Sequence, residues 1–514
     1  MQTTKKPITT LFLIWLAWAV LLLGFQKAAS MRIQLQVPDT VLDWVAEETV
    51  PGAHARQPYL NEPFLNRQVA YDSEYYISIA IAGYDDPTLF TIWLPPDREP
   101  ELIWSQSPLP LGFPKDYPGG RPDFIPANYT AYSLNYAFFP FYPLMLRMFG
   151  YPLIIFHLNP IATASLAGVL VSLLGALGAM LALYDLTRDE LGEAGALKTA
   201  FYLIVFPTGF FLAMVLTEGL FAGLAFGALA LLRRRQWLWA GLLAACATLT
   251  RGVGVALVIP LGLAWLAEAF PLISTWLEDG TIDRSGRWQL WSLIWKGLAS
   301  LTPLFAYQAW SFFLGKQFHA VEAAYFGRGA FLVEKSFDAW QWSFLSLFRF
   351  GDFHLAHWIG WGIVILAFCL VGKTLIWRQW GVRIPKAVTL AIDLLLLAFS
   401  AALIYVWGKN TINEQRSFYY MLEFSALILA LVACAYTLRS HTGLALFSLL
   451  VVLISFFSGE PQGMPRYILG APAVFVMLGQ LGKDDEIFDR AWTLGSILLL
   501  GLFALLFAFN FWVA

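Results

Sequence analysis

Charged residues are scarce in this sequence. Asp, Glu, Lys and Arg make up 13% of its 514 residues, whereas a soluble globular chain carries about a quarter. Hydrophobic residues make up 58% and fall in long uninterrupted runs. Together these features exclude an ordinary soluble domain and predict an integral membrane protein. The formal net charge of −2 provides no polyanion-binding surface, so we expect no nucleic-acid partner.

Cysteine is also rare. The three cysteines, Cys246, Cys369 and Cys434, lie inside apolar runs, which is typical of small core residues and not of a disulfide framework or a metal centre. The sequence has no glycine-rich phosphate loop, no paired-cysteine spacing, no serine nucleophile elbow and no visible internal repeat. We therefore predict no metal site and no bound cofactor. Whether the protein requires a divalent metal stays open at this point.

The apolar runs predict about thirteen transmembrane helices, because a helix needs about 17–25 residues to cross a bilayer. The first run, Ile8 to Phe25, is long for a signal peptide, so we interpret it as a retained span. The pair around 198–232 is interrupted by Phe206-Pro207-Thr208-Gly209, and such breaks are tolerated where they line a cavity or are covered by protein. The other spans are expected near 160–184, 198–215, 218–232, 237–250, 253–270, 290–314, 357–377, 387–407, 417–437, 442–458, 465–482 and 491–513.

Basic residues indicate which side each loop faces. Lys5 and Lys6, the run Arg233-Arg234-Arg235 and Arg439 fall in alternate loops, which the positive-inside rule assigns to the cytoplasm. The polar, proline-rich segment after the first span then faces the periplasm or lumen. We predict an all-α polytopic membrane protein made of an N-terminal transmembrane helix (1–30), an extracytoplasmic loop with amphipathic helices (31–158) and a helix bundle (159–514) that carries a second extracytoplasmic loop (315–356).

Asp72 is the main candidate for chemistry in the first outer loop. After it, Tyr75, Tyr76, Ile79, Ala80 and Gly83 recur at helical spacing, which predicts an amphipathic helix that lies flat on the membrane. Aspartate is a common helix N-cap, and the spacing alone favours that role. A cap also presents its carboxylate to solvent in a fixed pose, so the two roles do not exclude each other.

More ionisable residues stand at the outer ends of expected spans, namely Glu218, Arg251, Arg416 and Arg466. An ionisable group at membrane depth is a functional hypothesis, although a snorkelling or ion-paired helix end explains each one equally well. Their occurrence together, on the same side as Asp72, favours an anionic ligand. The aromatic stretch from Tyr136 to Pro143 is either an interfacial aromatic belt or a surface for a prenyl chain.

Several stretches, taken in order, resemble a known family. They are Asp72-Ser73 with Ile79-Ala80 and Gly83-Tyr84, then Tyr136 to Pro143, then Phe206 to Phe211 with Thr217-Glu218-Gly219-Leu220-Phe221, then Leu249-Thr250-Arg251-Gly252, then Met464-Pro465-Arg466-Tyr467. This order resembles the PIG-V-type mannosyltransferases of the GT-C class of polytopic glycosyltransferases. The chain departs from the family pattern at Tyr71, where tryptophan is usual, at Thr217, where serine is usual, and at Gly252, where proline is common.

The resemblance implies a GT-C-like helical bundle with an aspartate beside the donor in the first outer loop. It also implies inverting transfer of a sugar, mannose by family, from a polyprenyl- or dolichyl-phosphate donor to a lipid-linked or glycolipid acceptor. Inversion needs one base for the acceptor hydroxyl, and cations stabilise the leaving phosphate. We assign catalysis to Asp72 and substrate binding to Glu74, Tyr136, Glu218, Arg251, Arg416, Arg466 and Tyr467. Membrane lipids are the remaining expected partners.

Two alternatives stay open. A multispan lipid or glycolipid transporter or flippase would use the same intramembrane charges and broken helix as a substrate pathway, although the missing repeat and the large loop after the first span count against it. A glycan polymerase or ligase would instead use a diphosphate-linked donor.

Overall fold

The computed structural model describes residues 5–33, 64–85, 90–94, 104–106, 130–279, 284–315, 415–457, 463–509 and 511–513, with a few positions between 385 and 398. Its α-helices are α1 (Lys5–Arg32), α3 (Ser73–Ile81), α4 (Phe141–Leu153), α5 (Pro160–Val205), α6 (Glu218–Arg233), α7 (Trp237–Thr250), α8 (Val258–Asp279), α9 (Arg284–Ser300), α10 (Thr302–Leu314), α15 (Gln415–Thr437), α16 (Thr442–Phe456), α17 (Met464–Tyr467), α18 (Pro472–Asp484) and α19 (Glu486–Ala508). Its strands are β1 (Phe90–Leu94), β2 (Trp104–Gln106) and β3 (Thr130–Ser133), and its 3-10 helices are η3 (Asn66–Gln68), η4 (Leu134–Ala137), η5 (Ile154–Phe156), η6 (Gly209–Ala213), η7 (Gly252–Leu257) and η8 (Ile468–Gly470).

Four helical stretches in the described part are long and apolar enough to cross a membrane, namely Lys6–Arg32, Pro160–Val205, Gly252–Ser274 and Glu486–Ala508. Other apolar helices, such as α7 and α16, are shorter. This set indicates an integral membrane protein, because a helix satisfies all its backbone polar groups without water. The expected spans 357–377 and 387–407 and the loop 315–356 lie almost entirely outside the described residues, so the total of about thirteen spans stays a prediction.

The two spans predicted at 160–184 and 198–215 correspond to two consecutive helices within α5, which meet at a bend at Gly192 (φ 70°, ψ 178°). Ser172 donates a hydrogen bond of 3.0 Å to the carbonyl of Leu216, so the chain after the bend runs back along the first part of α5. Regular helix ends at Val205, and the next residues form η6. The predicted break at 206–209 is confirmed. The residues that follow it, 210–216, are almost completely buried, so protein covers the irregular backbone.

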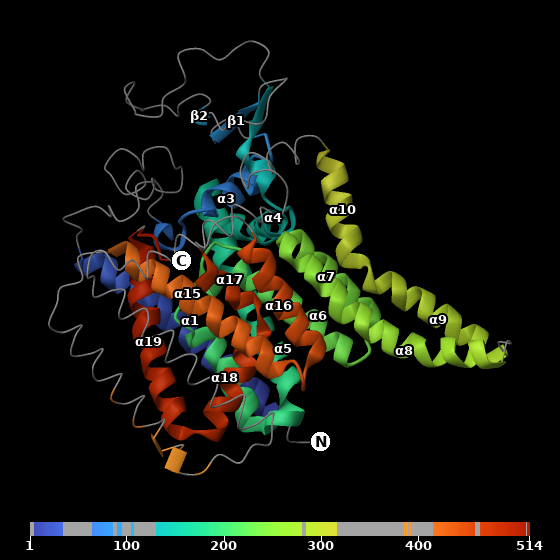
Figure 1. The fold of residues 1–514 in the computed structure, drawn as a ribbon. Coiled ribbons are helices and arrows are strands. Elements are labelled where there is room, and N and C mark those ends of the chain that lie inside the picture. The colour runs from blue at the N-terminus through green and yellow to red at the C-terminus, as the bar shows by residue number, and fades with distance from the viewer. Residues whose placement is uncertain are drawn as a thin grey trace, which may run out of the picture.

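The segment between α1 and α5 contains a small sheet that was not predicted. Its strands are antiparallel in the order β2-β1-β3, with Phe90 opposite Gln106 and Leu94 opposite Thr130. Figure 1 shows this sheet beyond α3 and α4, at one end of the helical bundle.

The predicted surface position of the helix after Asp72 is wrong. Every residue from 73 to 80 in α3 is buried, because α4 and α5 pack against this helix. The neighbouring helix α4 has one buried and one exposed face, since Tyr142 and Leu146 are buried while Leu144 and Met148 are exposed. Spacing in the sequence identified a helix at 73–81 but not the elements that cover its polar side.

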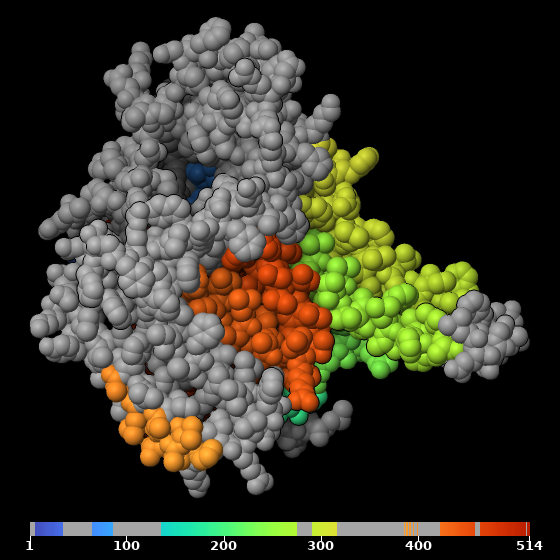
Figure 2. Space-filling view, viewed as in Figure 1, coloured from blue at the N-terminus to red at the C-terminus, as the bar shows by residue number. Residues whose placement is uncertain are grey.

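The bundle around α5 holds the rest of the chain together. Figure 1 shows α5, α6 and α18 near its centre, with α8 and α9 projecting to one side. α1 packs against α5 and α19, and α16 packs against α8. In Figure 2 the exposed surfaces of α15 and α16 (orange) adjoin α8, α9 and α10 on one face of the molecule.

Candidate functional site

Residues from four distant parts of the sequence meet at one end of α6. Asp72 precedes α3, Glu218 begins α6, Arg251 follows α7 and Arg466 lies in α17. α6 and α7 are joined by the short turn 234–236, so the start of α6 and the end of α7 lie at the same end of this helix pair. The basic run 233–235 lies at the opposite end, one helix length away.

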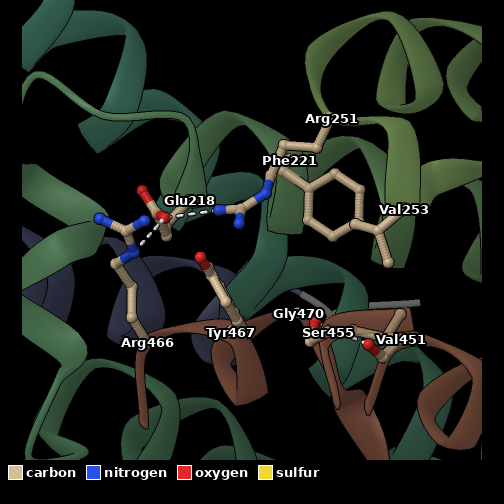
Figure 3. A pocket seen from close by; sticks show the side chains of 9 residues that line it. All are labelled: Glu218, Phe221, Arg251, Val253, Val451, Ser455, Arg466, Tyr467 and Gly470. Carbon is tan, nitrogen blue, oxygen red and sulfur yellow. Dashed lines mark hydrogen bonds and ion pairs between the residues drawn. The ribbon is translucent and has the colours of Figure 1, made fainter. Parts of the chain in front are cut away.

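Glu218 stands between two arginines (Figure 3). Its Oε1 atom accepts a hydrogen bond of 2.5 Å from Nη1 of Arg251 and lies 3.2 Å from Nε of Arg466. The side chains of Glu218 and Arg466 are only 4% and 7% exposed, whereas that of Arg251 is 20% exposed. Buried charges are tolerated only when they are paired and hydrogen-bonded, so the carboxylate and the two guanidinium groups act as one unit.

Asp72 contacts the same unit from the other side. Nη2 of Arg466 donates a hydrogen bond of 3.5 Å to Oδ2 of Asp72, whose side chain is 27% exposed. Asp72 occupies the N-cap position of α3 but makes no capping hydrogen bond with its side chain. Burial raises the pKa of this carboxyl group, Arg466 acts against that rise, and the negative charge of Glu218 adds to it.

Tyr467 lies beneath both arginines. The guanidinium carbons of Arg251 and Arg466 lie 5.1 Å and 5.3 Å from the centre of its ring, which is the range of cation–π attraction. In Figure 3 its hydroxyl group points toward the gap between the two guanidinium groups. The ring thus holds two like charges close together while leaving a hydroxyl group available in the gap.

The unit keeps unused hydrogen-bonding capacity. Within the described part of the chain, Oε2 of Glu218 and Nη1 of Arg466 are buried without a hydrogen-bond partner. Such groups are rare in native structures, and each one calls for an explanation. Both residues line a pocket whose empty volume is about 260 Å³, including its part open to solvent. Its lining residues are Glu218, Phe221, Arg251, Val253, Val451, Ser455, Arg466, Tyr467 and Gly470.

Close backbone approaches fix the position of this pocket. A Cβ atom on Gly219 would lie 2.4 Å from the carbonyl oxygen of Ser172, and one on Gly223 would lie 2.5 Å from that of Gly175. The Gly-x-x-x-Gly spacing therefore brings α6 directly against α5 and places Glu218 at the pocket. α17 is fixed by Thr208, whose hydroxyl group donates a hydrogen bond of 2.6 Å to the carbonyl of Pro465.

The predicted site residues do not all converge. The structure brings together Asp72, Glu218, Arg251, Arg466 and Tyr467. Tyr136 instead donates a hydrogen bond of 2.7 Å to Oδ1 of Asp85. Glu74 is buried in α3. Neither Tyr136 nor Glu74 is among the described residues that line the pocket. The side chain of Arg416, at the start of α15, lies outside the described residues.

Two polar neighbours of the site were not predicted. Tyr76 lies one helical turn after Asp72, and its hydroxyl group hydrogen-bonds with Thr217. Thr217 in turn lies 3.4 Å from Nη1 of Arg251. The four-residue spacing from Asp72 could have identified Tyr76, because residues i and i+4 share one helix face. Ser455 lies inside an apolar run of α16, where the sequence carries no such signal.

Comparisons with known proteins leave the function to be argued from these residues. No protein-family model matches the chain, and no curated protein matches it. Among solved structures, it is similar to the archaeal oligosaccharyltransferase AglB from Archaeoglobus fulgidus, in complex with an inhibitory peptide and a dolichol-phosphate, with a TM-score of 0.40 and 13% identity. The match covers 98% of this chain and 56% of that chain, so the present chain spans little more than half of that protein. A TM-score below 0.5 does not establish a common fold.

Proposed function

We propose that this protein is a membrane-embedded inverting glycosyltransferase of the GT-C class. It transfers a sugar, mannose by its family resemblance, from a polyprenyl- or dolichyl-phosphate donor to a lipid-linked or glycolipid acceptor on the extracytoplasmic face. One observation carries the proposal: a partly exposed carboxylate, Asp72, contacts a buried arginine, Arg466, whose Nη1 atom has no hydrogen-bond partner in the described part of the chain.

The proposed reaction is a single displacement. Asp72 takes the proton of the acceptor hydroxyl group as its oxygen forms a bond to the anomeric carbon of the donor sugar. The bond from that carbon to the phosphate oxygen breaks, and the electron pair leaves with polyprenyl phosphate. Attack opposite the leaving group inverts the configuration, so one base suffices and no covalent enzyme intermediate forms. A carboxyl group whose pKa is raised is a stronger base than an ordinary aspartate.

The arginines offer the leaving phosphate hydrogen-bond donors but no surplus charge. Asp72 and Glu218 carry two negative charges and Arg251 and Arg466 two positive ones, so the unit is formally neutral without a ligand. A donor phosphodiester adds one negative charge, and the unpartnered Nη1 of Arg466 is a hydrogen-bond donor for it. Arginine presents its donors in a planar fork that suits phosphate oxygens. The hydroxyl group of Tyr467 supplies a further donor beside the same gap.

The lining of the pocket suits the head of such a donor. Its charged side, formed by Glu218, Arg251 and Arg466, is where we expect the phosphate group to bind, while the prenyl tail extends into the membrane. On the side away from Glu218, Phe221, Val253 and Val451 present apolar surface (Figure 3).

A transfer assay tests the proposal. The purified protein in liposomes is incubated with polyprenyl-phosphate mannose, and separately with polyprenyl-phosphate glucose, with a membrane lipid extract as acceptor. We expect release of free polyprenyl phosphate, seen by mass spectrometry, and a glycolipid of inverted configuration, seen by NMR. Movement of intact donor between leaflets without release would indicate a flippase. Turnover only with a diphosphate-linked donor would indicate a polymerase or ligase.

A further inference from the structure

The residues just before Asp72 are held by the end of α19. Nη1 of Arg67 donates a hydrogen bond of 2.8 Å to the carbonyl of Ala508, and its guanidinium carbon lies 4.8 Å from the ring centre of Phe509. Next to Arg67, Nε2 of Gln68 donates a hydrogen bond of 3.0 Å to Oε1 of Gln26 in α1. Segment 65–72 is thus attached to two helices that contribute no side chain to the pocket lining given above. The carbonyl of Gln68 also accepts a hydrogen bond of 3.0 Å from the backbone N–H of Val215, three residues before Glu218.

Tyr71, the immediate neighbour of Asp72, makes the closest of these attachments. Its hydroxyl group donates a short hydrogen bond to the carbonyl of Phe511. Its ring meets the rings of Phe507 and Trp512 edge-on, with centres 5.3 Å and 4.8 Å apart. The side chain is 8% exposed, so the residues at the end of α19 enclose it almost completely.

The backbone of Tyr71 is in the left-handed region, with φ 53°. A non-glycine residue is uncommon there, and a bulky side chain persists in it only when its surroundings hold it. Here the ring contacts and the hydrogen bond from Phe507, Phe511 and Trp512 hold the side chain, and a turn holds the backbone, since the N–H and the hydroxyl group of Ser73 both donate to the carbonyl of Ala70. Loss of the side-chain contacts leaves the turn alone to hold Tyr71, and any shift of Tyr71 changes the direction in which the following residue, Asp72, projects.

The position of the Asp72 carboxylate next to Arg466 depends on the direction in which the Asp72 side chain projects. Its side chain makes no capping hydrogen bond, and its interaction with Arg466 is long at 3.5 Å. A small rotation of the backbone therefore separates Asp72 from Arg466. In contrast, the contacts among Glu218, Arg251 and Arg466 do not involve segment 65–72 and stay in place.

We infer that Tyr71 is a positioning residue, and that Phe507 in α19 and Phe511 and Trp512 after it hold Tyr71 so that Asp72 faces the donor pocket beside Arg466. This inference rests on the proposed function, since it assigns Asp72 the role of base. It gives a role in transfer to residues that lie outside the pocket and touch no reacting atom.

Two variants test the inference from opposite sides of the contact. Tyr71→Phe keeps the ring but removes the hydrogen bond to Phe511, and Trp512→Ala removes one ring contact. We expect each variant to lower kcat by about ten- to a hundredfold, since a misplacement of about 1 Å has effects of this size, with KM for the donor unchanged. The acid limb of the kcat profile should move to higher pH, because an Asp72 separated from Arg466 loses the cation that favours its ionised form.

Tyr84→Phe is the matched control. It removes a hydrogen bond of 3.0 Å from a tyrosine hydroxyl group to the carbonyl of Phe138, at the other end of α3. We expect a comparable change in melting temperature but no change in kcat or in the acid limb. If Tyr84→Phe lowers kcat as much as Tyr71→Phe does, Tyr71 has only a structural role. The same holds if the acid limb of the Tyr71→Phe profile stays at the pH of wild type.

Hydrogen exchange gives a second readout that needs no activity. Tyr71→Phe should speed amide exchange in both 65–72 and 505–513, whereas Tyr84→Phe should leave 505–513 unchanged. If wild-type protein transfers no sugar but exchange in the two segments rises together, the proposed function fails while the coupling holds. If transfer occurs and exchange in 505–513 does not respond to Tyr71→Phe, the inference fails while the proposed function stands.

Discussion

Nη2 of Arg466 lies 3.5 Å from Oδ2 of Asp72, although 394 positions separate the two residues in the sequence. The aspartate comes from the polar segment after α1 and the arginine from the short helix α17. Each residue also contacts a different environment: Asp72 is partly exposed, whereas Arg466 is buried against Glu218. The contact therefore connects a solvent-accessible base with a buried cation, an arrangement that suits proton removal next to a departing phosphate.

Asp72→Asn should abolish most transfer without unfolding the protein. An amide cannot accept the acceptor proton, and loss of a general base typically lowers the rate by about 10²–10⁴-fold. Donor binding should persist, because Arg251 and Arg466 are unchanged. Transfer rate and donor binding are measured on the same preparation, with Glu74→Gln as the milder comparison. Near-normal turnover in Asp72→Asn would assign the base to another residue.

The melting temperature of Asp72→Asn should equal or exceed that of wild type near neutral pH. The pKa of Asp72 is raised in the folded protein, chiefly by burial, so ionisation of this group disfavours folding. Its contribution to stability is fully present below the ordinary aspartate pKa of about 3.9 and is lost as pH rises through the raised value. The neutral amide avoids that loss. A clear fall in melting temperature at pH 7, with no such fall at pH 4, would contradict this sign.

The pH profile should respond in opposite directions to two substitutions. Transfer requires ionised Asp72, so the rate falls as pH drops through its pKa, above the ordinary value of about 3.9. Arg466 lowers this pKa and Glu218 raises it. The acid limb of kcat/KM should therefore move to higher pH in Arg466→Gln and to lower pH in Glu218→Gln, measured well below each melting temperature. A shift of both variants in the same direction would exclude Asp72 as the titrating group.

Much of the fold follows from the sequence alone, because apolar runs have clear ends. The helix predicted at 237–250 is confirmed as α7, and the one predicted at 218–232 is confirmed as α6, one residue longer. That these two helices cross the membrane stays a prediction, because neither is among the four described helices that are long and apolar enough. Charged residues or threonine bound these runs, and a bilayer-crossing helix ends where side chains must reach water. The break between the spans predicted at 160–184 and 198–215 is also confirmed, since the two helices of α5 meet at Gly192, inside the predicted gap.

The candidate site was predicted less completely, for a physical reason. Position at an outer helix end selected Glu218, Arg251 and Arg466, which the structure brings together, and also Arg416, whose side chain lies outside the described residues. Glu74 and Tyr136, selected on other grounds, do not line the described pocket. The spacing of the apolar residues from Tyr75 to Gly83 identified the helix after Asp72 and placed it on the membrane surface. The polar residues Ser73, Glu74 and Ser78 of this helix are nevertheless buried. The cover that buries them comes from α4 and α5, and contacts between distant segments leave no local pattern.

Glu218→Gln should destabilise the protein more than Arg251→Gln. One oxygen of Glu218 serves both arginines, so its loss leaves two cations facing each other, one of them fully enclosed. Removing one partner of a buried ion pair typically destabilises by about 3–5 kcal/mol. Arg251 is more exposed, and Glu218 keeps Arg466 when Arg251 is removed. Chemical denaturation in detergent measures the free energy of unfolding of each variant. The double variant Glu218→Gln/Arg466→Gln should recover part of the stability that Glu218→Gln loses. Equal effects of the two single variants would contradict a shared carboxylate.

Cysteine labelling should confirm the sidedness on which the donor assignment depends. In a chain whose native cysteines have been replaced, Ser107→Cys should react with an impermeant thiol reagent in intact cells. Gln236→Cys, an exposed position in the basic turn between α6 and α7, should react only after lysis. The positive-inside rule gives this order. The reverse order would invert the topology and move the pocket to the cytoplasmic face.

Gly223→Ala should weaken the contact of α6 with α5 and disturb the pocket through Glu218. The added Cβ atom would meet the carbonyl oxygen of Gly175 at 2.5 Å, and backbone atoms cannot rotate away as a flexible side chain can. Overpacking of this kind typically costs about 1–3 kcal/mol of folding free energy.

Gly262→Ala in α8 is the control, because its Cβ atom meets nothing within 4 Å. Since alanine is favoured over glycine in a helix by about 1 kcal/mol, that variant should be as stable as wild type or more so. Transfer should fall in Gly223→Ala and stay unchanged in Gly262→Ala. If Gly223→Ala matched Gly262→Ala in both measurements, the glycine contact would not determine the position of Glu218.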